Sequence, residues 1–240
     1  MIDPEYFDFL NGKRVAIVGP ASYLKNLDTG PFIDNFDVVV RINRGMELID
    51  DYADSIGRRT DILYNCLIKS PDNGGDLNIK SYHAHGVKWV STIPGSDING
   101  VCKSQKLHQM VSRIDVFKLK RNFNFHIMNH KEYSIVNKYI GTRANTGFAA
   151  IFDLLNHGIS ELYVTGFSFY LDSFMAGYKQ GCSRDEQEFA RQCFISERHK
   201  QKPQWKHLKD TFIVENRLLA DPVLKKILNL NELSRDIELL

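Results

Sequence analysis

Short apolar runs alternate with longer amphipathic segments along the chain. Several runs are nearly continuous in β-branched and other apolar residues, which is typical of parallel strands covered on both faces. Strands that alternate with helices predict a Rossmann-like, mostly parallel α/β sheet flanked by helices. The predicted strands are Val15–Val18, Phe36–Ile42, Ile62–Tyr64, Val87–Thr92, Asn124–Met128 and Glu161–Thr165.

Helical patterns occupy the segments between these runs. The sequence places Thr146 as the N-cap of one helix and Gly158 just beyond its end. The predicted helices are Ser104–Phe117, Lys131–Ile140 and Thr146–His157, followed by helices within Lys206–Leu240 that carry an apolar stripe at Leu218, Leu219, Val223 and Ile227.

The length of 240 residues suits a single domain spanning residues 1–240. A polar stretch at residues 171–205 interrupts the apolar pattern. It could form a mobile lid or an acceptor-binding insertion, and a solvated helix with flanking loops explains it equally well.

In a parallel sheet of this kind, ligands bind beyond the carboxyl ends of the strands. The residues that follow each apolar run are therefore the candidates for function. They are Gly19–Ser22, Arg41–Arg44, Tyr64–Asn65, Pro94–Asp97 and Gly166–Tyr170.

Charge and cysteine content narrow the class of protein. The 31 basic and 29 acidic residues give a net charge of +2, which does not indicate a nucleic-acid-binding protein. The four cysteines lack Cys-x-x-Cys pairing, as expected of free thiols in a reducing compartment. Because we find neither a signal-peptide pattern nor a run long enough to cross a membrane, we expect a soluble, cytoplasmic protein.

The first predicted strand ends in a turn of small residues, Gly19, Pro20, Ala21 and Ser22. Such a turn lets backbone N–H groups approach an anion or a ribose, although many strands end this way for turn geometry alone. The turn matches neither the glycine motif of dinucleotide sites nor that of P-loops.

The second predicted strand ends in polar residues that are costly to bury without partners. Arg41 could form an ion pair with Asp61, and Arg58 or Arg59 could take part in the same pairing. This role would be mainly structural. Asn43 has no such structural explanation and could donate to a phosphate or a ribose.

Asn145, Thr146 and Gly147 open a helix with small side chains, which leaves its first N–H groups accessible to an anion. The next strand ends at Gly166 and Phe167, where aromatic side chains could flank a base or a sugar.

The positions of the histidines favour a catalytic general base over a metal site. His83 with His85, and His126 with His130, lack neighbouring carboxylates or cysteines in sequence, so we expect no metal ligands. His207 is followed one turn later by Asp210, which could orient it as a general base, and a surface histidine is the alternative.

The order of these motifs resembles the sialyltransferase superfamily, and its compact bacterial and viral members more than the Golgi enzymes. The stretches "VAIVGPASYL", "DVVVRIN" and "GRRTDILYN" are similar to the large sialylmotif. The stretches "NTGFAAIFDLL" and "ELYVTGFSFY" are similar to the small one, and His207 would stand for the very small motif. The resemblance covers residues 13–65 and 141–220.

This resemblance implies a variant of the GT-A fold and an inverting, metal-independent glycosyltransferase. The enzyme would move sialic acid, Kdo or a related ulosonic acid from a CMP-activated donor to a glycan or glycolipid hydroxyl, with no cofactor. Gly19–Ser22 and Asn43 would contact the nucleotide, Asn145–Gly147 would hold the phosphate or donor carboxylate, and His207 would accept the acceptor proton. Arg41, Asp61, His199 and Asp210 would support the site.

Four departures from the family pattern concern the donor and the base. Pro20 replaces an asparagine, and Asn145 replaces the serine of the usual Ser-Thr-Gly. The aromatic motif is not clear, with His199 as its stand-in, and the expected acid five residues after His207 is replaced by Phe212.

Other classes of function stay open at this point. The protein could be a non-catalytic nucleotide-binding module, an interpretation favoured by Pro20. The basic and aromatic stretch "FKLKRNFNFH" could indicate a transferase acting on modified nucleic acid, and a solvated amphipathic strand explains it more simply. An oxidoreductase lacks support because its glycine motif is missing.

Overall fold

The computed structural model describes residues 3–94, 112–179 and 185–235. Within them, one seven-stranded sheet has the order β5-β4-β3-β2-β1-β6-β7, and every neighbouring pair is parallel. This confirms the predicted Rossmann-like sheet. The strands are β1 (Arg14–Val18), β2 (Val38–Ile42), β3 (Ile62–Tyr64), β4 (Trp89–Thr92), β5 (Asn124–Ile127), β6 (Glu161–Thr165) and β7 (Leu218–Ala220).

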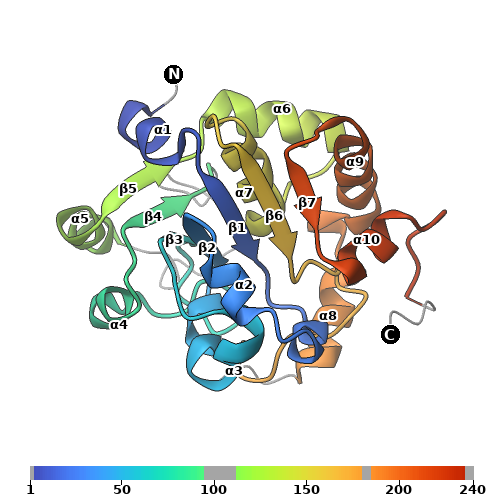
Figure 1. Cartoon of the computed structure of the whole chain (residues 1–240), viewed down its shortest axis with the longest axis horizontal. Coiled ribbons are helices and arrows are strands. Elements are labelled where there is room, and N and C mark those ends of the chain that lie inside the picture. The colour runs from blue at the N-terminus through green and yellow to red at the C-terminus, as the bar shows by residue number, and fades with distance from the viewer. Residues whose placement is uncertain (1–2, 95–111, 180–184, 236–240) are drawn as a thin grey trace.

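Helices cover both faces of this sheet (Figure 1). Helix α2 follows β1 on one face and α7 packs on the other, because the return from β5 to β6 crosses the sheet on the opposite side. The helices are α1 (Pro4–Leu10), α2 (Gly30–Asp34), α3 (Ile49–Ile56), α4 (Ile79–Ala84), α5 (Arg113–Asn122), α6 (His130–Ile140), α7 (Thr146–Leu155), α8 (Glu186–Phe194), α9 (Gln201–Val214) and α10 (Pro222–Leu228), with short 3₁₀ turns at Ser22–Asn26, Gly45–Leu48 and Glu197–His199.

Most predicted elements occur with small shifts at their ends. Strand β2 begins at Val38 rather than Phe36, and β4 begins at Trp89 rather than Val87. The helix predicted from Ser104 lies partly outside the described residues, and α5 begins after Ser112, whose side chain and Asp115 form a capping box.

The helical prediction for residues 218–220 is wrong. Leu218 and Ala220 are buried and pair with β6 as the short strand β7, and the helix α10 begins only at Pro222. Asp221 caps that helix by accepting a hydrogen bond from the Leu224 N–H at 2.8 Å.

The central strands β1 and β6 approach each other closely at their carboxyl ends. A Cβ atom on Gly19 would collide with the carbonyl group of Gly166, and the reverse also holds. Gly166 has φ of +75°, a conformation that favours glycine. The two glycines therefore let the chain turn away from the sheet at the point where the strand order reverses, which is where ligands bind in this architecture.

Among the helices in the described ranges, none combines the length and the apolar character that a membrane crossing needs.

Candidate active site

A cavity of about 230 Å³ opens at the carboxyl ends of β1, β2, β3 and β6. The first turn of α7 and the segment after β6 complete its wall. The predicted site residues that line it are Pro20, Ala21, Asn43, Asn145, Thr146, Gly147, Gly166, Phe167 and His199. The structure therefore brings together residues from both halves of the chain.

The remaining predicted residues lie around the cavity or away from it. Gly19 packs against Gly166 beneath it, and Ser22 donates a hydrogen bond to the Asp172 carboxylate at 2.8 Å. This bond ties the turn after β1 to the loop after β6. Of the candidate loop Pro94–Asp97, residues 95–97 lie outside the described residues.

Arg41 and Asp61 do not form the predicted ion pair. Arg41 is completely buried, and its guanidinium donates to the carbonyl groups of Ile56, Gly57 and Arg59 and to the Thr60 hydroxyl. Burial lowers the pKa of Arg41 to about 10, which leaves it charged at neutral pH.

Asp61 pairs instead with Arg59 at 3.0 Å and with Lys88 at 2.8 Å, and accepts a hydrogen bond from the Val39 N–H. The predicted pairing with Arg59 is therefore present. Both Arg41 and Asp61 organise the backbone around β2 and β3, and neither lines the cavity.

Asn43 follows β2 in a left-handed conformation, with φ of +51°. Its side-chain oxygen accepts a hydrogen bond from the Cys66 N–H at 2.9 Å. The side-chain carbonyl is thus occupied in holding the turn after β3, and the amide NH₂ group is the end of this side chain that can donate to a ligand.

The N-terminus of α7 faces the cavity, but its cap differs from the prediction. Asn145, rather than Thr146, is the N-cap, and its side-chain oxygen accepts a hydrogen bond from the Phe148 N–H at 2.8 Å. Thr146 and Gly147 form the first turn, whose N–H groups have no partner within the helix. These N–H groups and the helix dipole favour an anion in the cavity.

His199 has the environment of a neutral base at the cavity wall. Its Nδ1 lies 2.8 Å from the carbonyl oxygen of Arg143, and a carbonyl can only accept, so Nδ1 carries the proton. The other ring nitrogen, Nε2, then keeps a lone pair in the neutral ring. Burial, with added effects from the charges of Arg198 and Arg143, lowers the pKa of His199 to about 4.

His207 lies elsewhere, on α9. Its ring stacks on Phe152 with centroids 4.6 Å apart and lies 4.4 Å from the ring of Tyr139, and it does not line the cavity. Burial lowers its pKa, while the charge of Asp210 opposes that shift. Asp210 is likewise absent from the cavity wall.

Lys179 is a cavity residue that the sequence patterns did not single out. Its ammonium group donates to the carbonyl of Asp72 and lies 4.5 Å from the ring centroid of Phe189 and 4.8 Å from that of Tyr178. Burial lowers the pKa of Lys179 to about 8. Arg143 and Arg198 also line the cavity, so its wall carries three basic side chains.

The segment 171–205 supplies much of this wall. Lys179, Arg198 and His199 come from it, as do Tyr178 and Phe189. Residues 180–184 lie outside the described residues. The polar composition that suggested a lid or an insertion thus belongs to a segment that faces the cavity.

Comparison of the sequence with family models places the chain in a known family. The sequence model of glycosyltransferase family 29 (sialyltransferase) matches residues 3–145, more than half of the chain. Type 2 lactosamine alpha-2,3-sialyltransferases of Homo sapiens and Pan troglodytes are 30% identical over 100 residues, which are 39% of this chain and 30% of each relative. The chain thus spans about a third of the length of the curated relatives it matches.

Comparisons of structure agree on the fold. A mammalian sialyltransferase solved with Gal-beta-1-3GalNAc-ortho-nitrophenol has a TM-score of 0.57 at 15% identity, covering 92% of this chain and 74% of that one. The sialyltransferase CstII from Campylobacter jejuni, solved with the substrate analogue CMP-3FNeuAc, has a TM-score of 0.56 at 16% identity, covering 92% and 90%.

Proposed function

Because the chain belongs to glycosyltransferase family 29, the sialyltransferases, we propose that it transfers sialic acid or a related sugar acid from a CMP-activated donor to a glycan hydroxyl. The observation that carries the proposal is the cavity itself, where a helix N-terminus, three basic side chains and a neutral histidine meet. The helix N-terminus and the basic side chains suit the binding of a nucleotide phosphate. The neutral histidine can accept the proton of an acceptor hydroxyl.

We assign the general base to His199 rather than to His207. The Nδ1–H of His199 is held by the Arg143 carbonyl, so Nε2 can take a proton, as in other bases oriented by a second partner. In the proposed step, the acceptor oxygen bonds to the anomeric carbon as its proton passes to Nε2. The bond from that carbon to the phosphate oxygen breaks with its electron pair, and CMP leaves.

The basic wall makes a metal ion unnecessary for this step. Negative charge develops on the departing phosphate, and the N–H groups of the first turn of α7 can stabilise it together with Arg143, Arg198 and Lys179. A single displacement at the anomeric carbon inverts its configuration. The proposal is therefore an inverting transfer in which side chains take the role of the cation.

The ligands of the related structures support the choice of donor and acceptor classes. The CstII structure holds a CMP-linked sugar acid analogue, and the mammalian structure holds a galactose-terminated disaccharide derivative. A galactose-terminated glycan is accordingly the first acceptor to test. Residues 171–205 contribute much of the cavity wall, which supports an acceptor-binding role for this segment.

The test combines nucleotide binding with transfer. We expect CMP to raise the melting temperature more than UMP, UDP, ADP or NAD at equal concentration. With CMP-sialic acid and a lactosamine acceptor, we expect CMP release together with a sialylated product. Stabilisation by NAD or UDP alone would contradict the proposal, and selective CMP binding without transfer to any glycan would indicate a binding module.

A further inference from the structure

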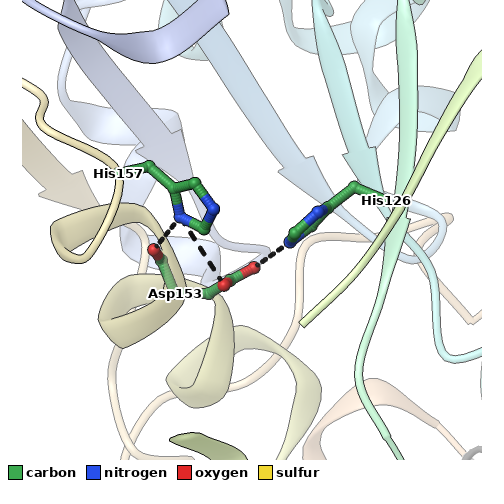
Figure 2. Close-up of side chains that lie close together, drawn as sticks. All are labelled: His126, Asp153 and His157. Carbon is green, nitrogen blue, oxygen red and sulfur yellow. Dashed lines mark hydrogen bonds and ion pairs between the residues drawn. The ribbon is translucent and has the colours of Figure 1, made fainter. Parts of the chain in front are cut away.

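A second group of polar side chains lies in the core, away from the cavity. His126 on β5, Asp153 on α7 and His157 just beyond the end of α7 are each almost completely buried, and none lines the cavity. One ligand atom from each of the three residues lies within 4.8 Å of the others. Figure 2 shows both imidazole rings beside the Asp153 carboxylate, one from β5 and one from the chain after α7.

The ring nitrogens of His126 have an unusual set of neighbours. Nε2 lies 3.0 Å from Asp153 Oδ2, and Nδ1 lies 3.4 Å from Asp3 Oδ2. Both neighbours are carboxylate oxygens, which accept hydrogen bonds, whereas a neutral imidazole has a single N–H. A neutral His126 would therefore direct one lone pair at a carboxylate, a repulsion that either a second ring proton or a metal cation between the two atoms removes.

Two further atoms of the cluster are buried without a hydrogen-bond partner. They are Asp153 Oδ1 and His157 Nε2. The other oxygen of Asp153 accepts a hydrogen bond from the Tyr64 hydroxyl at 2.7 Å, and His157 Nδ1 lies 2.6 Å from the Asp153 carbonyl oxygen. Leaving a carboxylate oxygen unsatisfied in the core is costly. Asp153 Oδ1 lies 3.7 Å from His157 Nδ1, beyond hydrogen-bond distance, and both unsatisfied atoms are electron-pair donors that a cation could share.

We propose that His126, Asp153 and His157 bind one divalent transition-metal ion of the zinc class. Imidazole nitrogen and carboxylate oxygen are established zinc ligands, and three protein ligands leave one position of the tetrahedron to a water molecule. The contact from Asp3 to the non-ligating nitrogen of His126 matches the carboxylate partner that orients metal-binding histidines. Ligands on a tetrahedral zinc ion lie about 3.3 Å apart, so small side-chain movements would close the site.

The role of this ion would be structural. Asp153 and His157 lie near the carboxyl end of α7, whose other end presents Asn145 to the cavity. An ion shared with His126 on β5 would fix the direction of α7 against the sheet. The inference is independent of the transfer reaction, because no ligand of the site touches the cavity.

The direct test is metal analysis of the untagged protein produced with added zinc and then dialysed. We expect about one zinc ion per chain and, after exchange, the visible absorption of tetrahedral cobalt(II). Removal with a strong chelator should lower the melting temperature by about 5–10 °C, and added zinc should restore it. A protein that contains no metal, does not respond to zinc and gives no cobalt spectrum would overturn the proposal.

Variants locate the site. Asp153→Asn keeps the shape of the side chain, and His157→Gln removes one imidazole, so each should lose most of the metal and the cobalt absorption. His130→Gln changes an exposed histidine four residues from His126 and should retain both. If Asp153→Asn folds poorly, His157→Gln and the chelation of the unaltered protein still decide the question. Full metal content in both cluster variants would place the ion elsewhere and contradict the assignment.

Discussion

The two histidines near α9 have different surroundings and therefore different expected roles. His199 lines the cavity with an oriented ring, whereas His207 packs against Phe152 outside it. We expect His199→Ala to lower kcat by about 10²–10⁴-fold, because it removes the proton acceptor, while the affinity for CMP changes little. His207→Ala should retain kcat within a few-fold. The assignment is contradicted if His207→Ala abolishes transfer with CMP binding intact and His199→Ala does not.

The pH profile tests the environment of His199 separately. A base acts only when it is unprotonated, and a histidine with a pKa of about 4 stays neutral until the pH falls through that value. We expect kcat/KM to be constant from pH 7 down to about 5 and to fall below about 4. Circular dichroism at each pH would confirm that the protein stays folded. Loss of activity centred near pH 6.5 would indicate an exposed imidazole instead.

Lys179 should set the alkaline limit of nucleotide binding. Its charge is lost as the pH rises through about 8 in the free protein, and a bound anion raises that pKa by favouring the charged form. CMP affinity should therefore decrease above about pH 8 and level off once Lys179 is neutral in the complex as well. Isothermal titration calorimetry at several pH values measures this decrease. The Lys179→Arg variant should keep its affinity for CMP at alkaline pH. If Lys179→Met shows the same dependence of CMP affinity on pH as the unaltered protein, Lys179 does not contact the bound anion.

At the scale of elements, a substitution at the N-cap of α7 should change nucleotide binding without lowering stability. Asn145→Asp preserves a capping oxygen for the Phe148 N–H and suits the helix dipole, so the melting temperature should not fall. The new carboxylate lies at the cavity wall, and we expect it to weaken CMP binding by about 10–100-fold through charge repulsion. Calorimetric titration with CMP measures the effect.

A matched control exists in another helix. Asn78 caps α4 in the same way, by accepting a hydrogen bond from the Ser81 N–H at 3.0 Å, and it does not line the cavity. Asn78→Asp should leave CMP affinity unchanged. Equal affinities for the two aspartate variants would show that the N-terminus of α7 does not face the bound phosphate.

The elements predicted from sequence were those whose signal is local. Six strands followed from continuous apolar runs, because parallel strands buried on both faces need such residues. Strand β7 did not, since its middle residue Leu219 is partly exposed and Asp221-Pro222 follows at once. Unlike the buried run of β3, the leucines of β7 also fit a helical stripe together with Val223 and Ile227.

The site was predictable to the extent that it follows strand ends. The positions of Pro20, Ala21, Asn43 and Gly166 at the cavity followed from strand ends alone, because the carboxyl ends of parallel strands meet at one edge. His199 was named only as a supporting residue, since its hydrogen bond to Arg143 joins residues far apart in sequence. Lys179 and the cluster of His126, Asp153 and His157 likewise depend on long-range packing that no local pattern records.

At the scale of the whole molecule, the cavity and the histidine–aspartate cluster lie at opposite ends of α7. The cavity carries its own cations, Arg143, Arg198 and Lys179, so CMP should bind without a metal ion. The cluster should contribute to stability alone. Chelation is therefore expected to lower the melting temperature of the free protein and to leave the increment produced by CMP unchanged.

The rise in melting temperature that CMP produces can be calculated. CMP at about a hundred times its Kd stabilises the folded state by about 2.7 kcal/mol, which corresponds to roughly 5–10 °C for a chain of this length. Differential scanning calorimetry with and without chelator, each with and without CMP, separates the two effects in four measurements. Loss of the CMP increment in chelator, with recovery on adding Mg²⁺ or Mn²⁺, would place a cation in the cavity and contradict the side-chain mechanism. If chelation lowers the melting temperature of the free protein but CMP still raises it by the same amount, both proposals are supported. Each end of α7 then responds only to its own ligand.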